Sequence, residues 1–479
     1  MTIERLLQGI TVKEMQGDLQ TEISGVCYHS GKLQPGNLFV AVRGYRSDGH
    51  SYIDAAVESG AAAVVVEQWQ PKLQLPQILV ENSRKALALL SANWYGHPAE
   101  KMRLIGVTGT NGKTTVTYLV KEILERAGRK VGLIGTNQNM VGHMVLKSNH
   151  TTPESLELQE LFSIMAREQV DDVIMEVSSH SLALNRVYGC RFAVAAFTNL
   201  TQDHLDFHGT MENYIEAKAK LFSMCDMAVV NGDDPAAEQL VSGVKCPVSR
   251  YGESAAHDIC AQNISLYARG VEFSALDTPF SLPIPGHFSV YNALCAIGIC
   301  RALGIDTTDI RTALFKAHGV KGRAEIVDVP TDYTVMIDYA HTPDGLQNIL
   351  QTARGFCQGR LIVLFGCGGD RDKTKRPVMG EIAGNLADFC IVTSDNPRTE
   401  EPEDIINDIL PGLKPTGTPY EVICSRRDAI AFGLALAKED DILLLAGKGH
   451  ETYQILKSGT IEFDERVIVK EALKKLGKV

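Results

Sequence analysis

The sequence predicts an α/β protein of three domains. At 479 residues the chain is longer than one hydrophobic core usually organises, and a prior of about 150 residues per domain gives about three domains. Two separate stretches alternate short apolar runs of strand length with helical periodicity, which indicates mostly parallel sheets covered by helices. Hydrophobic residues make up 44% of the chain, enough to fill several cores.

Composition disfavours several classes of protein. The formal net charge of -11 disfavours a duplex nucleic-acid partner, because such partners need a face rich in Lys and Arg, although it leaves room for a local basic pocket. The 11 cysteines are scattered without CxxC spacing, which disfavours a disulfide framework or a structural zinc site and fits a reducing compartment. We find no signal-peptide pattern and no apolar run of about 18 residues, so we expect a cytoplasmic protein without membrane insertion.

The first predicted domain covers residues 1–100. Strand-like runs occur at 38–42 and 62–66, and a helical pattern follows at 83–94. The Gly-His-Pro cluster at 96–98 breaks this helix and marks a boundary.

The second predicted domain covers residues 101–323 and begins with a strand, a loop and a helix. The strand is predicted at 103–107, and apolar residues at helical spacing follow from Lys113 until Gly128. Three further apolar runs predict buried parallel strands, at 131–134, 173–177 and 193–197.

The third predicted domain covers residues 324–479 and repeats the α/β rhythm. Its four apolar runs predict another buried sheet, with strands at 334–337, 361–365, 389–393 and 442–445. The boundary between the second and third domains is predicted near residues 322–325.

A glycine-rich loop follows the first strand of the second domain. Backbone N–H groups of such a loop and the start of the next helix converge on one point, which suits a polyphosphate. The Lys113 ammonium can reach β- and γ-phosphates, and the Thr114 hydroxyl can join a Mg2+ shell. A structural turn that merely opens a helix is the alternative. The loop residues are Gly109, Thr110, Asn111, Gly112, Lys113, Thr114 and Thr115.

This loop departs from the general GxxxxGK[ST] pattern, because Val107 stands where the first glycine would fall. It resembles the TGTNGKTT loop of the Mur ligase superfamily, which also contains folylpolyglutamate synthase. Further family-like motifs are EVSSH at 176–180, NLTQDHLD at 199–206, DYAHTPD at 338–344 and DNPR at 395–398, so the resemblance spans essentially the whole chain.

The resemblance implies a three-domain fold and an activity. The domains would be an N-terminal uridine-binding α/β domain, a central P-loop ATPase domain with a mostly parallel sheet, and a C-terminal Rossmann-like domain. The activity would be an ATP- and Mg2+-dependent amide-bond ligation in peptidoglycan precursor synthesis. The expected partners are UDP-MurNAc-L-Ala-D-Glu and meso-diaminopimelate, and the expected state is a monomer.

A metal centre is predicted beside the loop. Glu176 and His204 follow strand-like runs, where parallel sheets place ligands, and a carboxylate near a triphosphate suits Mg2+. Taken singly, each residue reads equally well as a capping or loop side chain. The family resemblance assigns metal contacts to Thr114, Glu176, His204 and Lys218, with Lys218 as the lysine that carries a carbamate. Lys113, Glu176, His204 and Lys218 are then the expected catalytic residues.

Four further residues resemble nucleotide contacts of the family. Asn292 matches the residue that contacts the adenine side of ATP, and Arg323 matches the hinge arginine. Asp338 and His341 belong to the DYAHTPD motif, which would reach the nucleotide when the domains close.

Three strand ends of the third domain carry the expected amino-acid site. The resemblance assigns it to Arg371, Asp395, Asn396, Pro397, Arg398, Gly447 and Glu451. An arginine fork can grip a carboxylate and Glu451 can take an ammonium, a combination suited to meso-diaminopimelate. Its LL isomer and L-lysine stay open as substrates. A dinucleotide-binding GxGxxG reading of 366–371 is disfavoured by arginine at its last position.

The acceptor substrate has its own expected contacts. Ser30 matches the uridine-binding domain, although His29 and Gly31 depart from the usual family residues there. Thr151, Thr152, Ser178 and Arg186 match positions that hold UDP-MurNAc-L-Ala-D-Glu. Leu184 stands where some members have glutamine, so one polar contact is missing or replaced.

Two rival functions remain at this stage. One is another member of the same superfamily, which the DNPR motif together with GKGHE at 447–451 disfavours. The other is a P-loop ATP-binding switch protein that ligates nothing.

Overall fold

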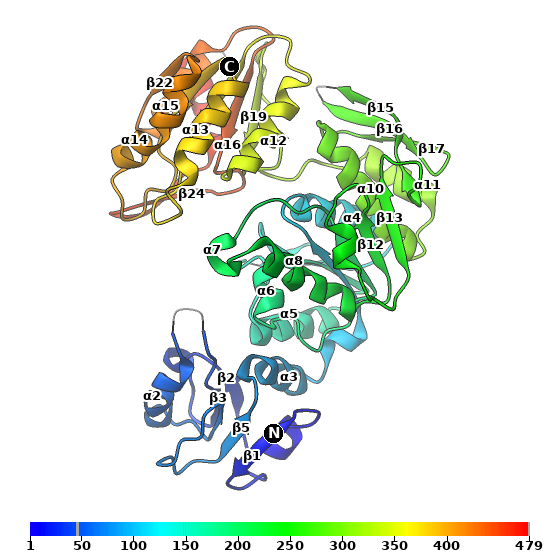
Figure 1. Ribbon diagram of the computed structural model, residues 1–479, viewed down its shortest axis with the longest axis vertical. Coiled ribbons are helices and arrows are strands. Elements are labelled where there is room, and N and C mark those ends of the chain that lie inside the picture. Colours follow the sequence, from blue (N-terminus) through cyan, green and yellow to red (C-terminus); the bar gives the residue numbers. More distant parts are fainter. Residues whose placement is uncertain (45–46, 147, 149, 268, 478–479) are drawn as a thin grey trace. The chain divides into compact units, whose positions relative to one another are not determined.

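The computed structural model describes residues 1–44, 47–146, 148, 150–267 and 269–477 (Figure 1). The chain divides into two compact units. The first contains Met1–Asp258 and Cys295–Ile310, and the second contains Ile259–Leu294 and Arg311–Val479. The helices α10 (His287–Ala302) and α11 (Thr307–Phe315) include residues of both units.

The first unit begins with a five-stranded sheet in the order β1-β5-β4-β3-β2. Strands β2 to β5 are parallel, and β1 joins antiparallel to β5. Both faces of β4 are buried, as its Ala-Val-Val-Val sequence requires. The elements are α1 (Ile3–Leu6), β1 (Val12–Gln16), β2 (Gly25–Cys27), η1 (Ser30–Lys32), β3 (Asn37–Val40), η2 (Gly49–Tyr52), α2 (Ile53–Glu58), β4 (Ala63–Val66), β5 (Gln77–Val80), α3 (Ser83–Tyr95) and η3 (Pro98–Lys101).

The second sheet of this unit runs in the order β13-β12-β11-β6-β10-β7-β8-β9. The strands from β13 to β7 are parallel, whereas β8 and β9 form an antiparallel extension. In register, Glu176 lies opposite Val107 and Phe197 opposite Thr108, so three strands end side by side at the phosphate loop. This edge positions the candidate site.

The elements around this second sheet alternate between strands and helices. They are β6 (Arg103–Thr108), α4 (Lys113–Arg126), β7 (Val131–Ile134), β8 (Asn139–Val141), β9 (Met144–Leu146), α5 (Ser155–Arg167), β10 (Asp172–Glu176), α6 (Ser179–Ala183), β11 (Val194–Phe197), α7 (Leu205–His208), α8 (Met211–Ala219), η4 (Lys220–Met224), β12 (Ala228–Asn231), α9 (Ala237–Leu240) and β13 (Val248–Gly252).

The second unit contains a six-stranded sheet in the order β18-β19-β23-β20-β21-β22, parallel except for β18. Alternate side chains of β20 enter two cores: Val363 packs with residues of α12 to α14, and Leu364 packs with residues of α15 and α16. Helices therefore cover both faces, as the continuous apolar strands require.

The second unit also contains a three-stranded antiparallel sheet, β15-β16-β17, and the hairpin β24-β25. Further helices and strands make up this unit besides α10 and α11. They are β14 (Ile259–Cys260), β15 (Gln262–Tyr267), β16 (Gly270–Ala275), β17 (Thr278–Leu282), β18 (Glu325–Ile326), β19 (Thr334–Asp338), α12 (Pro343–Arg354), β20 (Leu361–Phe365), α13 (Lys375–Leu386), β21 (Phe389–Val392), α14 (Pro402–Leu413), η5 (Lys414–Thr416), β22 (Tyr420–Val422), α15 (Arg426–Leu436), β23 (Ile442–Ala446), β24 (Tyr453–Leu456), β25 (Gly459–Glu462) and α16 (Glu465–Lys475).

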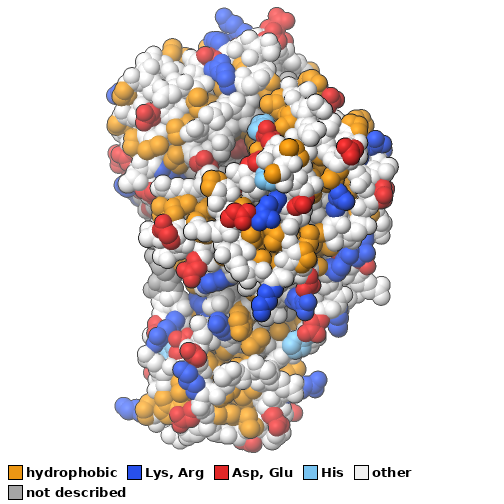
Figure 2. All heavy atoms as spheres, turned by 45° about the vertical axis from the view of Figure 1, so that its right-hand side comes forward, with side chains coloured by type: hydrophobic (Ala, Val, Ile, Leu, Met, Phe, Trp, Pro, Cys, Tyr) orange, Lys and Arg blue, Asp and Glu red, His pale blue; other side chains and the backbone are white. Residues whose placement is uncertain are grey.

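The predicted fold class, α/β with mostly parallel sheets, is confirmed. Across the described part of the chain, none of the helices is long and apolar enough to cross a membrane. Figure 2 shows acidic and basic side chains interspersed over the face in view, so the negative net charge does not form a single acidic surface there.

Candidate active site

The phosphate loop connects β6 to α4 through two glycines that no other residue replaces easily. A Cβ on Gly109, whose φ is +148°, would lie 1.9 Å from Thr198 Oγ1. Gly112 has φ +85° and is the N-cap residue immediately before α4. The loop therefore packs directly on the end of β11, and its glycines serve close approach and turning.

The segment that follows β11 fixes this loop through hydrogen bonds. Asn199 O accepts from Thr110 N at 2.8 Å, and Asn199 Oδ1 accepts from Asn111 N at 2.9 Å. Thr198 Oγ1 donates to Asn111 O at 2.6 Å. Thr198 and Asn199 thus fix the loop conformation, a role that the sequence interpretation did not assign to them.

Two lysines converge on one carbonyl of the loop. Lys113 Nζ donates to Gly109 O at 2.9 Å and to Thr110 O at 2.8 Å, and Lys218 Nζ also donates to Gly109 O at 2.9 Å. Lys218 is only 1% exposed. Burial, together with the neighbouring Lys113 charge, holds the pKa of Lys218 well below its ordinary value. The site therefore favours the neutral amine of Lys218.

The Glu176 carboxylate is buried and oriented by three hydrogen bonds. Thr114 Oγ1 and Thr136 N donate to Oε1 at 3.0 and 2.8 Å, and Thr136 Oγ1 donates to Oε2 at 3.0 Å. A Cβ on Gly135 would lie 2.5 Å from Oε1, so Gly135 leaves room for the carboxylate. Thr136 is a site residue that the sequence interpretation missed, because it belongs to no quoted motif.

His204 and Lys218 both lie near the Tyr214 ring. The ring centroids of His204 and Tyr214 are 6.4 Å apart, and Lys218 Nζ lies 4.5 Å from the Tyr214 centroid. The Tyr214 hydroxyl is 3.2 Å from Thr110 Oγ1, and His204 Nε2 lies 3.3 Å from Asp203 Oδ2. Tyr214 therefore links these two predicted catalytic residues to the loop, although no motif indicated it.

The side-chain oxygens beside the loop suit Mg2+, which also binds phosphates and water, better than a metal ion coordinated by protein side chains alone. Within the residues that the structure describes, no group of three or more His, Cys, Asp or Glu could hold a metal ion. Thr114 and Glu176 nevertheless bring a hydroxyl and a carboxylate within 3.0 Å of each other beside the loop. Mg2+ is commonly bound by one or two carboxylates with substrate phosphates and waters, so these residues fit it.

The predicted acceptor contacts lie next to Glu176. Thr152 is fully buried; its Oγ1 donates to Glu176 O at 2.9 Å and accepts from Ser178 N at 3.1 Å. Thr151 Oγ1 lies 3.0 Å from Thr136 Oγ1. Arg186 Nη1 donates to Thr152 O at 2.8 Å. The structure thus connects the predicted acceptor residues to the predicted metal ligand.

A charged network joins this segment to the first sheet. Arg186 Nη2 pairs with Glu154 Oε1 at 2.8 Å, and Arg84 of α3 pairs with Glu154 Oε2 at 3.4 Å. The Tyr28 hydroxyl donates to Glu157 Oε1 at 2.7 Å, and burial raises its pKa. Arg84, Glu154 and Glu157 were not predicted as site residues, because they read as ordinary surface charges of helices.

Ser30 begins the short helix η1 in the first domain. The preceding His29 accepts from Gly31 N through its Nδ1 at 3.2 Å, which is the capping role that Ser, Asp or Asn usually fills. The unusual His29 and Gly31 therefore have a local structural explanation, and Ser30 itself is half-buried.

In the second unit, three of the four predicted nucleotide contacts lie around Tyr339. The Arg323 guanidinium lies 4.9 Å from the Tyr339 ring, and His341 Nδ1 lies 2.8 Å from Tyr339 O. Asp338 Oδ2 accepts from Ala324 N at 2.7 Å, and burial raises the Asp338 pKa to about 6 despite Arg323. Asn292 is buried on α10, in the same unit.

The strand ends of the six-stranded sheet bring Asn396 and Glu451 together. Asn396 Nδ2 donates to Glu451 Oε2 at 2.9 Å. Lys448 Nζ donates to Asn396 Oδ1 at 3.0 Å and to Glu451 Oε2 at 2.9 Å. Lys448 is fully buried, and the sequence interpretation quoted it within a motif without giving it a role.

Asp395 presents a carboxylate oxygen without a partner at this place. Its Oδ2 is buried and has no hydrogen bond to any residue that the structure describes. A Cβ on Gly447, whose φ is +118°, would lie 2.7 Å from that oxygen. The glycine therefore leaves the carboxylate room, and the oxygen is available to a hydrogen-bond donor or a cation.

The two predicted arginines lie beside Gly368. A Cβ on Gly368 would lie 2.9 Å from Arg398 Nη1 and 3.7 Å from Arg371 Cγ. Arg398 has φ +55°, and its Nη1 donates to Gly369 O at 2.8 Å. Pro397 is buried next to Gly369, where an added Cβ would lie 1.9 Å from Pro397 O. The close packing of the Pro397 backbone against Gly369 therefore fixes the position of the neighbouring Arg398.

Three family models match the chain in succession. They are described as Mur ligase family, catalytic domain, over residues 22–95, Mur ligase middle domain over 107–300, and Mur ligase, glutamate ligase domain, over 322–449. The UDP-N-acetylmuramoyl-L-alanyl-D-glutamate--2,6-diaminopimelate ligase of Caldanaerobacter subterraneus subsp. tengcongensis is 50% identical over 479 residues, which cover 99% of each chain. The chain belongs to the Mur ligase family.

Solved structures of Mur ligases share the fold. A structure of UDP-N-acetylmuramoyl-L-alanyl-D-glutamate--2,6-diaminopimelate ligase is 30% identical, covers 100% of both chains and has a TM-score of 0.71. MurF from Acinetobacter baumannii, at 19% identity, covers 99% of this chain and 98% of its own with a TM-score of 0.65, which shows a shared fold alone. The predicted family resemblance and the three-domain Mur ligase fold are confirmed.

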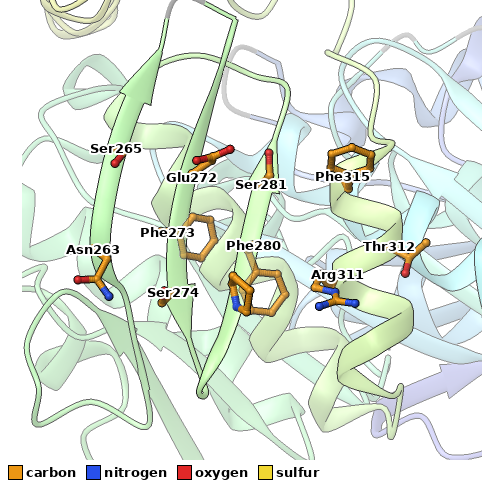
Figure 3. A pocket seen from close by; sticks show the side chains of 11 residues that line it. Asn263, Ser265, Glu272, Phe273, Ser274, Phe280, Ser281, Arg311, Thr312 and Phe315 are labelled. Atoms are coloured by element: carbon orange, nitrogen blue, oxygen red, sulfur yellow. The ribbon is translucent and has the colours of Figure 1, made fainter.

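One pocket lies away from all of these Mur ligase motifs. It has a volume of about 500 Å³ and is formed by the β15-β16-β17 sheet and α11 (Figure 3). Figure 3 shows Ser265, Glu272 and Ser281 on the strands and Arg311 on the helix. None of the predicted site residues lines it.

Proposed function

We propose that this chain is an ATP-dependent ligase that joins meso-diaminopimelate to the D-Glu side-chain carboxylate of UDP-MurNAc-L-Ala-D-Glu. The relative from Caldanaerobacter bears the name of such a ligase and matches the chain from end to end. The observation that carries the amino-acid assignment is the unpartnered Asp395 Oδ2 next to Gly447, on the strand ends that also carry Glu451 and Arg398.

The phosphate loop is the proposed binding place for ATP. Its glycines, the start of α4 and the Lys113 ammonium supply the donors that a triphosphate needs. Thr114 and Glu176 would hold Mg2+, with His204 as a further ligand, and the ion would neutralise charge on the transferred phosphoryl group. A solved MurF from Thermotoga maritima contains ADP, but at 20% identity it supports the fold alone.

Lys218 is the proposed carbamylated lysine. A carbamate forms when a neutral amine attacks CO2 and loses one proton, and the depressed pKa of Lys218 favours that neutral amine. The product places a negative carbamate beside the Lys113 ammonium, where a charged Lys218 would instead be repelled, since both lysines lie at Gly109 O.

The proposed amino-acid site suits a substrate end group, or head, that carries both a carboxylate and an ammonium. Arg398 and Arg371 offer guanidinium groups to a carboxylate, while Asp395 and Glu451 offer oxygens to an ammonium. L-Lysine has no second carboxylate and would leave the arginines without a counter-charge. This argument favours diaminopimelate over lysine and does not separate its meso and LL isomers.

The remaining predicted residues keep their proposed roles. Ser30, Thr151, Thr152, Ser178 and Arg186 would hold the UDP substrate, with Asn396, Pro397 and Gly447 shaping the amino-acid site. Asn292, Arg323, Asp338 and His341 would contact the nucleotide. We also propose domains at 1–100, 101–323 and 324–479, a cytoplasmic location and a monomeric state.

The proposed reaction proceeds in two displacements. An oxygen of the D-Glu carboxylate attacks the γ-phosphorus of ATP, ADP leaves, and an acyl phosphate results. The free amine of the amino acid then attacks the acyl carbon, phosphate leaves, and the amine loses a proton as the amide forms. Lys113 would stabilise the negative charge of the first step.

Phosphate release measured with all combinations of substrates tests this proposal. We expect release only when ATP, Mg2+, UDP-MurNAc-L-Ala-D-Glu and a diamino acid are present together, with diaminopimelate preferred over L-lysine; the rates with the meso and LL isomers decide between those two. Hydrolysis of ATP that ignores both other substrates would instead indicate an ATP-dependent switch protein and refute the ligase.

A further inference from the structure

The ammonium of Lys448 is buried among the residues of the proposed amino-acid site. Its side chain has no exposed surface and follows Gly447 directly after β23. Nζ lies 5.8 Å from the Tyr453 ring and 6.0 Å from the Phe463 ring. A buried ammonium is costly unless it is paired, and this one donates to Asn396 Oδ1 and Glu451 Oε2.

These bonds set the orientation of two proposed substrate contacts. Asn396 Oδ1 accepts from Lys448 and from Ile455 N at 2.9 Å, so the Asn396 amide nitrogen turns towards Glu451. Glu451 Oε2 then receives two donors. Its other oxygen, Oε1, accepts no hydrogen bond from any described residue, and the side chain is 11% exposed. Lys448 therefore holds one oxygen of Glu451 and leaves the other open.

The same lysine adds to the positive charge of the site. Asp395 and Glu451 bring two negative charges, and Lys448, Arg371 and Arg398 bring three positive charges. Three of these groups act on Tyr453: burial raises the pKa of its hydroxyl most, Glu451 and Asp395 raise it further, and Arg398 lowers it. A site without net negative charge suits a head that carries an ammonium and a carboxylate, whereas a lone ammonium is better matched by a site of net negative charge.

We infer that Lys448 is a positioning residue that selects a zwitterionic amino-acid head over a lone ammonium. It acts through Asn396 and Glu451 and through the net charge of the site. This inference rests on the proposed function, because it concerns which amino acid that reaction accepts. Removing the Lys448 charge would take away one of the three positive charges of the site, which favours L-lysine relative to meso-diaminopimelate.

The test compares Lys448→Met with Lys457→Met in the full-length chain. Lys457 is an exposed lysine of the same domain that pairs with Glu401 at 2.6 Å, so its variant removes the same charge outside the site. Phosphate release gives kcat and KM separately for each amino acid. We expect the meso-diaminopimelate to L-lysine ratio of kcat/KM to fall by about tenfold or more in Lys448→Met, with the KM for ATP unchanged. Lys457→Met should keep the ratio.

Two results would overturn the inference: an unchanged ratio in Lys448→Met, or an equal loss with both amino acids. The double variant Lys448→Met with Glu451→Gln guards against misfolding, because it removes both members of the buried pair. The double variant should melt near the wild-type temperature; because Glu451 is itself a proposed ammonium contact, this variant reports on folding and not on the substrate ratio. A wild-type chain that turns over no amino acid would refute the proposed function itself.

Discussion

In this Mur ligase the phosphate-loop region of the first unit and the proposed amino-acid site of the second unit differ in how their charged groups are paired. In the first unit, Glu176 receives three hydrogen bonds and Lys113 donates to two loop carbonyls, so these charges have protein partners. In the second unit, Asp395 Oδ2 has no described partner, and Arg398 pairs with backbone carbonyls without a described carboxylate. The first region is organised by its own protein contacts, whereas the second keeps a carboxylate oxygen that the described residues do not pair.

This difference separates general chemistry from substrate choice. A phosphate loop serves every member of a ligase family, so its geometry can be fixed internally. A site that distinguishes amino acids gains selectivity when an absent ligand group leaves a buried polar atom unpaired. Four predictions test this distinction.

Lys113→Ala should give the largest effect. Removing the ammonium leaves the transferred phosphoryl group without its protein cation, so kcat should fall by on the order of a thousandfold or more. The UDP substrate should still bind, which fluorescence or calorimetric titration measures. Substantial remaining activity would exclude this role for Lys113.

Arg398→Ala should act on the amino acid alone. Loss of a charge partner should raise the KM for meso-diaminopimelate by on the order of a hundredfold, while the KM for ATP stays unchanged. Arg398→Lys should rescue little, because lysine lacks the planar fork. If every KM rose together, a folding defect would explain the result, and the contrast between the regions would fail.

Thr136→Val should have a smaller effect, which appears both in kcat/KM and in the Mg2+ requirement. The variant keeps the side-chain shape but removes the hydroxyl that bonds Glu176 Oε2 and neighbours Thr151. Loss of one hydrogen bond to a charged group predicts about a tenfold fall in kcat/KM. A Mg2+ titration of the rate should require more metal than in wild type; an unchanged requirement would argue against Thr136 orienting the carboxylate.

His450 should give the smallest effect, on stability. Burial and nearby cations lower its pKa from 6.5 to about 4, so the unfolded chain takes up a proton between these values and the folded chain does not. Stability should therefore decline as pH falls from 6.5 to 4, by about 1–3 kcal/mol from this residue.

The control for this prediction is His450→Gln, compared with wild type by melting temperature across that pH range. Asp338 titrates there with the opposite sign, because its raised pKa keeps a proton on the folded chain, but it is present in both proteins. Between pH 6.5 and pH 4 the melting temperature should fall further in the wild type than in His450→Gln. A constant difference would contradict the shifted pKa.

The sequence predicted the main parallel strands well and the short elements poorly. The runs at 131–134 and 361–365 coincide with β7 and β20, because fully buried strands read as continuous apolar segments. The three-stranded sheet β15-β16-β17 was missed, since its strands are partly exposed and its β15 is largely polar. The hairpin β24-β25 was missed for the same reason.

In the candidate site, the residues within motifs were predicted from the sequence, whereas the residues that orient them were not. Thr114 and Glu176, predicted together, lie 3.0 Å apart. Thr136, Tyr214 and Lys448 were not assigned roles, because each acts on another protein group rather than on a ligand, and such contacts follow from tertiary packing. The full charge state of the amino-acid site therefore required the structure.

Gly447 has a consequence for any compound that binds Asp395. A side chain at this position would approach Asp395 Oδ2 to 2.7 Å and would also have to adopt φ +118°. An inhibitor that placed a cation on that oxygen would thus contact a position where mutation damages the enzyme itself. Resistance through substitution at this glycine would be hard to acquire.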